Sequence, residues 1–202
     1  MLEALRAGLA ASSAAELISV LLGLAYLLLA VRRSRLCWVA GGISCAILVY
    51  LAAQKHLPMQ ALLNVFYVGM SAYGFWHWSR EAADSAGAVT TLPVRWHLAA
   101  CAGVAAASVL SAHWLARETQ AAWPYLDSLS TWASLYATWL VARVKLENWI
   151  YWLVIDAVLA WLFAAQKLYL FALLNLVYVV VVLFGFAAWL KSYRLRRATG
   201  LA

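Results

Sequence analysis

Residues 145–178 read KLENWIYWLVIDAVLAWLFAAQKLYLFALLNLVY, and they predict an apolar helix, a short loop and the start of a second apolar helix. At about 100° per residue, one face of the first helix carries four residues: Asn148, Trp149, Trp152 and Asp156. Asp156 falls near the middle of this helix. An ionised carboxylate at the centre of a bilayer costs about 2.5–3.5 kcal/mol, so it normally faces a cavity or a partner. We therefore expect this face to line a substrate site.

The composition is that of a membrane protein. Of the 202 residues, 67% are hydrophobic and 11% are charged, which is far from the balance of soluble domains. The apolar runs are continuous and about 16–20 residues long, which favours membrane-spanning helices over a closed barrel. The basic residues lie in short loops, so the net charge of +7 indicates topology rather than nucleic-acid binding. We expect an all-α, polytopic protein of the lipid bilayer.

The apolar pattern predicts seven spans, at residues 16–31, 36–53, 58–78, 97–115, 124–142, 149–165 and 169–190. Pro58 and Pro124 fall at the expected starts of two spans, where a missing N–H is tolerated. The only long connection, residues 79–96, is polar and contains Gly and Pro, and we expect it to be a flexible loop.

The Lys and Arg residues are distributed unevenly between the two sides of the predicted bundle. The side with the N-terminus carries four of the 15, including Lys55 and Lys167, and the opposite side carries eleven. Cytoplasmic loops carry the excess of positive charge in membrane proteins. We therefore expect the N-terminus outside and the C-terminus in the cytoplasm.

An internal repeat predicts the architecture. The sequence AAQKHLPMQALLNVFYVGMSAYGFWHW, starting at Ala52, matches AAQKLYLFALLNLVYVVVVLFGFAAW, starting at Ala164, with one residue gapped in the loop. The third and seventh spans, which carry the match, point the same way. We therefore expect one membrane domain with two parallel three-helix repeats, about 14–80 and about 124–192, joined by an inverting helix at about 97–115.

The repeat separates shared polar positions from unshared ones. It pairs the residues of the polar face with unlike residues: Asn148 with Leu36, Trp149 with Cys37, Trp152 with Ala40 and Asp156 with Ser44. This pairing predicts a specialised site on the sixth span alone. The shared positions are Gln54, Asn64 and Tyr67, matched by Gln166, Asn175 and Tyr178. These residues either bond helices together or line a central site between the repeats.

The sequence offers little for an enzyme. No GxSxG, HExxH or P-loop motif occurs, and no two carboxylates share a helix face. Cys37, Cys45 and Cys101 stand singly, without the spacing of a metal site. We therefore expect no catalytic residue, no metal site and no cofactor.

Aromatic residues are abundant, with 12 Trp, 10 Tyr and 6 Phe. Many belong to the interfacial belt of a membrane protein, but Trp152 lies inside the sixth span, close to Asp156. A flat cation is held well by an aromatic wall with a carboxylate as its partner. Two interpretations stay open for these residues, a site for a cationic ring or structural pairing and packing between helices.

The chain resembles the PnuC family of vitamin transporters. The resemblance is carried by residues 127–178, DSLSTWASLYATWLVARVKLENWIYWLVIDAVLAWLFAAQKLYLFALLNLVY, and by ALLNVFYVGMSAYGFWHW from Ala61. Its most specific part is the KxENWxxW segment that leads into an aspartate. The resemblance implies a three-plus-one-plus-three fold in a bacterial inner membrane, facilitated uptake of nicotinamide riboside for NAD biosynthesis, trapping by a cytoplasmic kinase, and a homotrimer. It also implies substrate-contacting or gating roles for five residues: Asn64, Trp149, Trp152, Asp156 and Gln166.

The expected substrate agrees with the chemistry of the polar face. Nicotinamide riboside carries a positive charge on a flat ring and a polar ribose, which aromatic, carboxylate and amide groups can bind. Thiamine is also a cationic aromatic molecule, so it is the second candidate on the same scaffold. A membrane receptor that binds the same ligand without moving it is the alternative from a different class.

Overall fold

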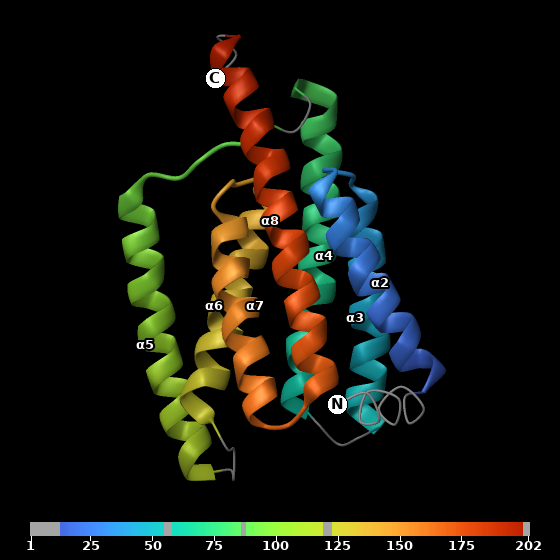
Figure 1. Cartoon of the computed structure of the whole chain (residues 1–202), viewed down its shortest axis with the longest axis vertical. Helices are drawn as coiled ribbons and strands as arrows, with labels where there is room; N and C mark the ends of the chain where they lie inside the picture. Colours follow the sequence, from blue (N-terminus) through green and yellow to red (C-terminus); the bar gives the residue numbers. More distant parts are fainter. Residues whose placement is uncertain (1–12, 55–57, 86–87, 119–122, 200–202) are drawn as a thin grey trace.

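The computed structural model describes residues 13–54, 58–85, 88–118 and 123–199. Within these residues the chain forms seven helices: α2 (Ala14–Val31), α3 (Leu36–Gln54), α4 (Pro58–Ser85), α5 (Val94–Glu118), α6 (Pro124–Ala142), α7 (Asn148–Ala165) and α8 (Tyr169–Ala198). The helices run alongside one another in one elongated bundle (Figure 1). The predicted all-α fold is confirmed, and α4 and α8 continue well past their predicted ends.

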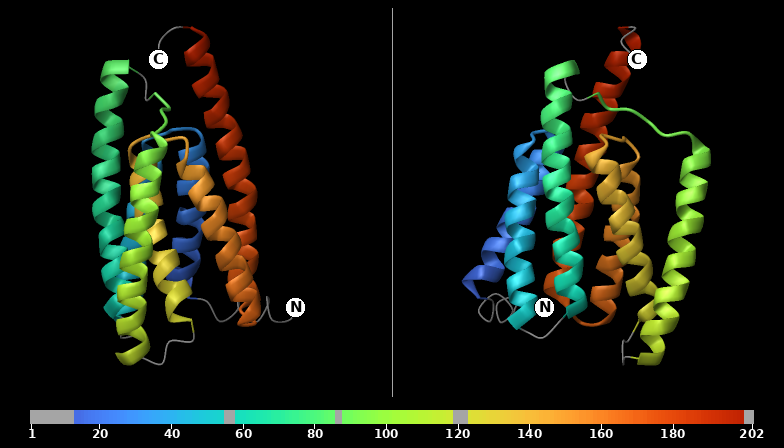
Figure 2. Two further views of the ribbon diagram at one scale, coloured as in Figure 1. Left: turned by 90° about the vertical axis from the view of Figure 1, so that its left-hand side faces the viewer. Right: turned by 180° about the vertical axis from the view of Figure 1, so that it is seen from behind.

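Five of the described helices are long and apolar enough to cross a membrane: α2, α3, α5, α7 and α8. The other two, α4 and α6, lie alongside them in the same bundle (Figure 2). They are more polar because α4 carries Gln60 and Asn64 and α6 carries a run of Ser and Thr. Several of these polar side chains are buried, among them Asn64, Ser128 and Ser134. The polar residues of α4 and α6 are therefore concentrated inside the bundle, where a solute site can form.

The helices form two groups of three. In the first group α3 packs between α2 and α4, and in the second α7 packs between α6 and α8. The two groups meet where α2 packs on α8 and where α4 packs on α6. The remaining helix, α5, packs on α6 at the edge of the bundle (Figures 1 and 2). This is the expected arrangement of two three-helix units joined by one linking helix.

A constant interval of 111 residues relates the two groups. It connects the ends of matching helices: Val31 with Ala142, Gln54 with Ala165, and the helix starts Pro58 and Tyr169. It also connects Arg33 and Val144, which have positive φ angles of 54° and 50° in the turns before α3 and α7. The gap that the sequence alignment needs in the loop is therefore wrong, because the helix ends keep one register throughout.

This register changes the partners of the polar face on α7. Each residue of the face now matches a residue one position later than predicted: Asn148 matches Cys37, Trp149 matches Trp38, Trp152 matches Gly41 and Asp156 matches Cys45. The predicted pairing is wrong because it rests on the AAQK identity at the ends of α3 and α7, which is offset by 112 residues and not by 111. Trp149 is therefore a duplicated residue, whereas Trp152 and Asp156 have unlike counterparts.

Four indoles form the core at the end of the bundle where α3 and α7 begin: Trp38, Trp78, Trp149 and Trp189. Trp38 meets Trp78 with ring centroids 5.6 Å apart, and Trp149 meets Trp189 at 5.3 Å, both edge to face. Gly74 and Gly185 allow these contacts, because a Cβ at either position would collide with the ring of Trp38 or Trp149. Each half therefore carries the same cluster of two tryptophans and one glycine, which we call its aromatic clamp.

The clamps also tie the halves together. The indole of Trp78 in the first half donates to the carbonyl of Ala142 in the second, at 3.0 Å. The indole of Trp189 in the second half donates to the carbonyl of Ala30 in the first, at 3.2 Å. The same Trp189 indole also lies 3.2 Å from the carbonyl of Val31, so both indoles bond carbonyls in the last turn of a helix of the other half. The two helix ends are thus held by reciprocal contacts across the bundle.

The connection between α4 and α5 is more ordered than a flexible loop. α4 itself covers the first part of the predicted loop. Beyond it, the amide of Thr90 donates to the carbonyl of Val144 at 3.1 Å, and the amide of Leu146 donates to the carbonyl of Thr90 at 2.9 Å. The amide of Leu92 donates to Oε1 of Glu147 at 2.8 Å. The expectation of a flexible loop is therefore wrong for this segment, which is bonded to the turn before α7.

Candidate functional site

Asp156 lies in the middle of α7 with an exposed fraction of 4%. Its carboxyl group is close enough to the Tyr178 hydroxyl on α8 to interact with it electrostatically. That hydroxyl lies 3.7 Å from the point where a Cβ on Gly23 would stand, and Oγ of Ser44 lies 3.9 Å from the same point. Gly23 and Ser44 belong to α2 and α3, so Asp156 faces the junction of the two halves and not the lipid.

A second tyrosine occupies the matching place in the first half. Tyr67 on α4 precedes Tyr178 by the same 111 residues, and its hydroxyl lies near Ser134 on α6. Ser134 in turn matches Gly23. Each tyrosine therefore reaches from its own half to the first helix of the other half. The centre of the bundle is bordered by hydroxyl groups from both sides.

Asn64 and Asn175 lie one turn from these tyrosines, and both are buried. Nδ2 of Asn64 donates to the carbonyl of Gln60 at 2.8 Å, and Nδ2 of Asn175 donates to the carbonyl of Phe171 at 2.8 Å. Their carboxamide oxygens accept no hydrogen bond from the described residues. Neither oxygen is fully enclosed by protein atoms, so both can accept a hydrogen bond from the hydroxyl or amide group of a ligand.

The two indoles at the start of α7 differ in their surroundings. Trp149 has an exposed fraction of 2%, and its ring lies against Gly185 and edge-on to Trp189. Trp152 is half-buried at the border of the same core. Trp149 is thus held by protein atoms on these sides, whereas Trp152 has ring surface that a ligand can cover.

The two halves carry a comparable aromatic ring on different helices. In the first half, Tyr26 of α2 lies so close to Gly41 of α3 that a Cβ there would stand 2.8 Å from the ring. The matching residues of the second half are Ala137 on α6 and Trp152 on α7. The ring therefore comes from the first helix in one half and from the middle helix in the other. This exchange puts Trp152 on the same helix as Asp156, one turn away.

The remaining predicted residues lie toward the ends of the bundle. Asn148 is fully buried at the start of α7, and its Nδ2 donates to the carbonyl of Lys145 at 2.6 Å. Gln54 and Gln166 are exposed at the opposite end. At 1.5 Å per helical residue, Asn148 and Gln166 lie about 12–15 Å along α7 from Asp156. The structure therefore does not bring these three residues to the centre, and Lys55 lies outside the described residues.

Sequence analysis did not identify Ser44 or Ser134 as neighbours of the site. Oγ of Ser44 donates to the carbonyl of Ser19 at 2.8 Å, which joins α3 to α2 beside the centre. The available signal was the spacing of hydroxyl residues on α6, where Ser128, Thr131 and Ser134 recur at every third position. That spacing places hydroxyls along one side of a helix, but without the contacts of α4 it does not show which helix they face.

The densest group of titratable side chains in the described residues joins α5 to the start of α7. Nδ1 of His97 lies 3.0 Å from the Tyr151 hydroxyl, and Nε2 of His97 lies 3.6 Å from Oε1 of Glu147. Sγ of Cys101 lies 3.8 Å from the same hydroxyl. No group of three His, Cys, Asp or Glu residues in the described ranges could hold a metal ion. We therefore read this group as a tether for the peripheral helix.

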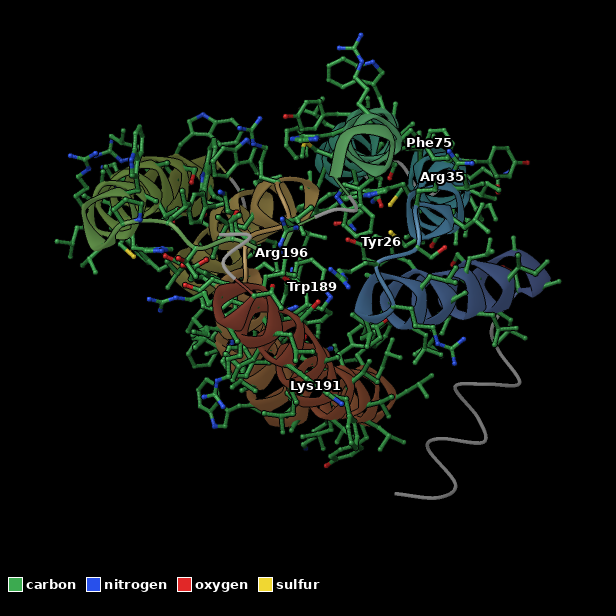
Figure 3. All side chains as sticks on the ribbon, turned by 90° about the horizontal axis from the view of Figure 1, so that it is seen from above. Tyr26, Arg35, Phe75, Trp189, Lys191 and Arg196 are labelled. Carbon is green, nitrogen blue, oxygen red and sulfur yellow. The ribbon has the colours of Figure 1, made fainter. Side chains whose placement is uncertain are left out.

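The end of the bundle with the C-terminus is basic. Figure 3 looks onto this end, where Arg35, Lys191 and Arg196 come from α8 and from the turn before α3. The Arg35 guanidinium stands 5.8 Å from the centre of the Phe75 ring. Burial lowers the pKa of the Arg33 guanidinium, and the neighbouring charge of Arg196 lowers it further. Positive charge is thus crowded at one mouth of the bundle.

Known proteins are similar to this chain in sequence and in fold. Residues 13–191 match the family described as nicotinamide mononucleotide transporter. The chain is similar to the nicotinamide riboside transporter PnuC of Escherichia coli (strain K12) and to that of Shigella flexneri, each 26% identical over 178 residues, with 74% of this chain and 73% of the relative covered. The fold is similar to a solved structure described as "Crystal structure of the Vitamin B3 transporter PnuC", with a TM-score of 0.71 and 21% identity over 89% of this chain and 82% of that one. Because the family match covers most of the chain, this multi-pass membrane protein belongs to the nicotinamide mononucleotide transporter family.

Proposed function

We propose that this chain carries nicotinamide riboside across a membrane by facilitated diffusion. The family and the activity that two relatives are named for support this proposal. The observation that carries it is the place of Asp156, which is buried at the junction of the two halves beside Tyr178. A carboxylate at that depth normally faces a polar cavity or an oppositely charged group, and the pyridinium ring of the riboside supplies such a charge.

The residues around Asp156 suit the other parts of this ligand. Trp152 offers half-buried ring surface on which the nicotinamide ring stacks. The carboxamide oxygens of Asn64 and Asn175 accept hydrogen bonds from ribose hydroxyls or from the ligand amide. The hydroxyls of Tyr67 and Tyr178 border the same space from opposite halves. Each polar group of the riboside thus has a partner of matching chemistry.

We place the other predicted residues at the two mouths of the path. Asn148 and Trp149 lie at the basic end, and Gln54 and Gln166 lie at the opposite end. Access alternates between these ends as the halves rock on each other where α2 meets α8 and α4 meets α6. The bonds of the Trp78 and Trp189 indoles join the halves at the basic end, which supports the proposal that this end is the closed one.

We further propose that the basic end is cytoplasmic, in a bacterial inner membrane. A cytoplasmic kinase that phosphorylates the riboside would convert it to an anion that no longer fits beside Asp156. Such trapping makes uptake directional although this chain, without an ATP-binding motif, only equilibrates the solute. Assembly as a homotrimer is part of the same proposal.

Counterflow tests the proposal directly. The purified chain is reconstituted into liposomes loaded with unlabelled nicotinamide riboside, and labelled riboside is added outside. A transporter accumulates label transiently, whereas a receptor that binds the same ligand gives no accumulation. Unlabelled thiamine and riboflavin outside serve as competitors, and nicotinamide riboside is expected to compete best. Absence of counterflow in liposomes that hold folded protein would overturn transport, and stronger competition by thiamine would overturn the choice of substrate.

A further inference from the structure

A cavity of about 690 Å³ lies between α4, α5 and α6, apart from Asp156, and polar side chains, most of them on α6, interrupt its otherwise apolar lining. It occurs in the part of the bundle where α4 and α6 begin, and eight of its lining residues carry a hydroxyl, amide or carboxyl group: Gln60, Tyr67, Ser111, Asp127, Ser128, Ser130, Thr131 and Ser134. A second cavity of about 440 Å³, between α5, α6 and α7, is lined almost wholly by apolar residues such as Leu129 and Val154. The second cavity suits a lipid chain, but polar groups in the first require water or a polar solute.

The wall of this cavity carries a hydroxyl group without a protein partner, that of Ser128. Its exposed fraction is 6%, yet it has no hydrogen-bond partner among the described residues. Hydroxyls in helices usually bond the carbonyl three or four residues earlier, as Ser130 does to the carbonyl of Asp127 at 2.9 Å. A buried hydroxyl that lines a cavity without such a bond is free to bind a molecule there.

The inner wall of this cavity borders the central site. Tyr67 and Ser134 both line the cavity, and the Tyr67 hydroxyl lies near the Ser134 side chain. Tyr67 is also close enough to Cys45, the counterpart of Asp156, to interact with it electrostatically. Leu159, which lines the cavity from α7, lies one helical turn beyond Asp156. Tyr67 and Ser134 thus lie between the cavity and the centre of the bundle.

We propose that this cavity is a water-filled vestibule for the transported cation, with Asp127 as its counter-charge and the Tyr67–Ser134 pair as its inner gate. Asp127 is the lining residue that carries a negative charge, and it lies in the first turn of α6, at the end of the cavity remote from Tyr67. The cation meets Asp127, passes the hydroxyls of Ser128 and Thr131, and reaches Asp156 when the gate opens. The identity of the cation rests on the proposed function, whereas hydration, negative potential and gate do not.

Cysteine labelling of the full chain in lipid nanodiscs tests whether the vestibule is wet. Methanethiosulfonate reagents react with thiolates, which form in water and not in lipid. We expect a cationic reagent to modify Ser128→Cys and Thr131→Cys at least about tenfold faster than Leu129→Cys, which lies on the same helix in the apolar cavity. Peptide mass spectrometry distinguishes these sites from the native cysteines. Equal rates at the three positions would overturn the vestibule.

The counter-charge and the gate have separate tests in the same system. In Thr131→Cys, adding Asp127→Asn should lower the rate ratio of cationic to neutral reagent about fivefold, as the loss of one nearby charge does, and an unchanged ratio would overturn the role of Asp127. Tyr67→Ala should speed modification of the native Cys45 behind the gate, with Leu63→Ala on the same helix as the control. A Cys45 rate unchanged by Tyr67→Ala would overturn the gate.

These outcomes are independent of transport. A dry cavity overturns the vestibule and leaves the proposed function standing, because labelling needs no transported solute. If the cavity is wet and prefers cations, saturating nicotinamide riboside should slow cationic labelling of Thr131→Cys severalfold. A wet, cation-selective cavity in a chain that shows no counterflow would support the vestibule and overturn the proposed transport instead.

Discussion

At the scale of single residues, the two halves differ where the chemistry requires it. Asp156 and Cys45 occupy matching positions, as do Trp152 and Gly41. The duplicated halves have matching backbones. The carboxylate and the indole occur in the second half alone, and they make the centre asymmetric. The duplicated Trp38 and Trp149, in contrast, make the same contact with a glycine in each half. The duplicated tryptophans therefore serve packing, the duplicated Asn and Tyr pairs border the centre from both halves, and Asp156 and Trp152 make it asymmetric.

Removal of the Trp152 ring tests its role as a wall of the site. We expect Trp152→Ala to lose most riboside uptake, because stacking contributes about 1–2 kcal/mol for a desolvated cation. Trp152→Phe should retain a measurable part of it, since a smaller ring still stacks. Uptake into proteoliposomes measures both variants, with size-exclusion profiles as the control for folding. Uptake of Trp152→Ala equal to that of the unmodified chain would reduce Trp152 to a packing residue.

At the scale of helices, contacts of glycine with indole set how closely neighbouring helices approach. Gly185 lets α8 meet the Trp149 ring, and Gly74 does the same for α4 and Trp38. Close approach is the main source of helix association in membranes, where lipid competes equally for apolar surface. The same helices carry Tyr67 and Tyr178, so the glycine contacts also position the hydroxyls at the centre.

The smallest enlargement of Gly185 tests this packing. Gly185→Ala places a Cβ against the Trp149 ring, and we expect a loss of about 1–3 kcal/mol in stability, as for other overpacked sites. Gly69→Ala on α4 is the matched control, because a Cβ there meets no atom within 4 Å. Thermal unfolding followed by tryptophan fluorescence compares them. Equal midpoints for both variants would contradict the packing role of Gly185.

Hydrogen exchange tests the segment between α4 and α5. The amides of Thr90 and Leu146 each donate to a backbone carbonyl across the two connections. We therefore expect peptides that cover residues 89–92 to exchange as slowly as those of the turn before α7, because exchange requires opening of these bonds. Mass spectrometry of the reconstituted chain measures this. Exchange of residues 89–92 at the rate of an unstructured loop would show that the segment is not bonded to the turn.

The helices were predictable from sequence because continuous apolar runs of membrane length have few other solutions. The register of the repeat was not, because the AAQK identity at the ends of α3 and α7 is offset by one residue from the register of the helices themselves. The actual register depends on backbone bonds, such as the amide of Ser34 donating to the carbonyl of Leu29 and that of Lys145 donating to that of Leu140. Such backbone bonds cannot be recognised from the types of the residues that make them.

At the scale of the whole molecule, the protein is a nearly symmetric frame around an asymmetric centre. The path that we propose runs from the vestibule at Asp127, past Tyr67, to Asp156, and ends at the basic mouth. Sequence alone predicted Asp156, because one acid in an apolar span is conspicuous. It did not predict Ser134 or Gly23 as its surroundings, since these residues reach the centre only through packing of α2 and α6 against the opposite half. The sequence indicates a site between the halves only through the residue whose burial in the membrane costs the most free energy.

Calorimetric titration of the purified chain with a charged and an uncharged ligand tests the central claim that Asp156 binds a positive ring. The ligands are nicotinamide riboside and the C-riboside of benzamide, which has a similar shape and no ring charge, and each is titrated into the unmodified chain and into Asp156→Asn. We predict that the substitution weakens binding of the riboside at least about tenfold, as expected for a lost charge pair, and changes binding of the neutral analogue far less. Equal changes for the two ligands, or none for either, would contradict the account.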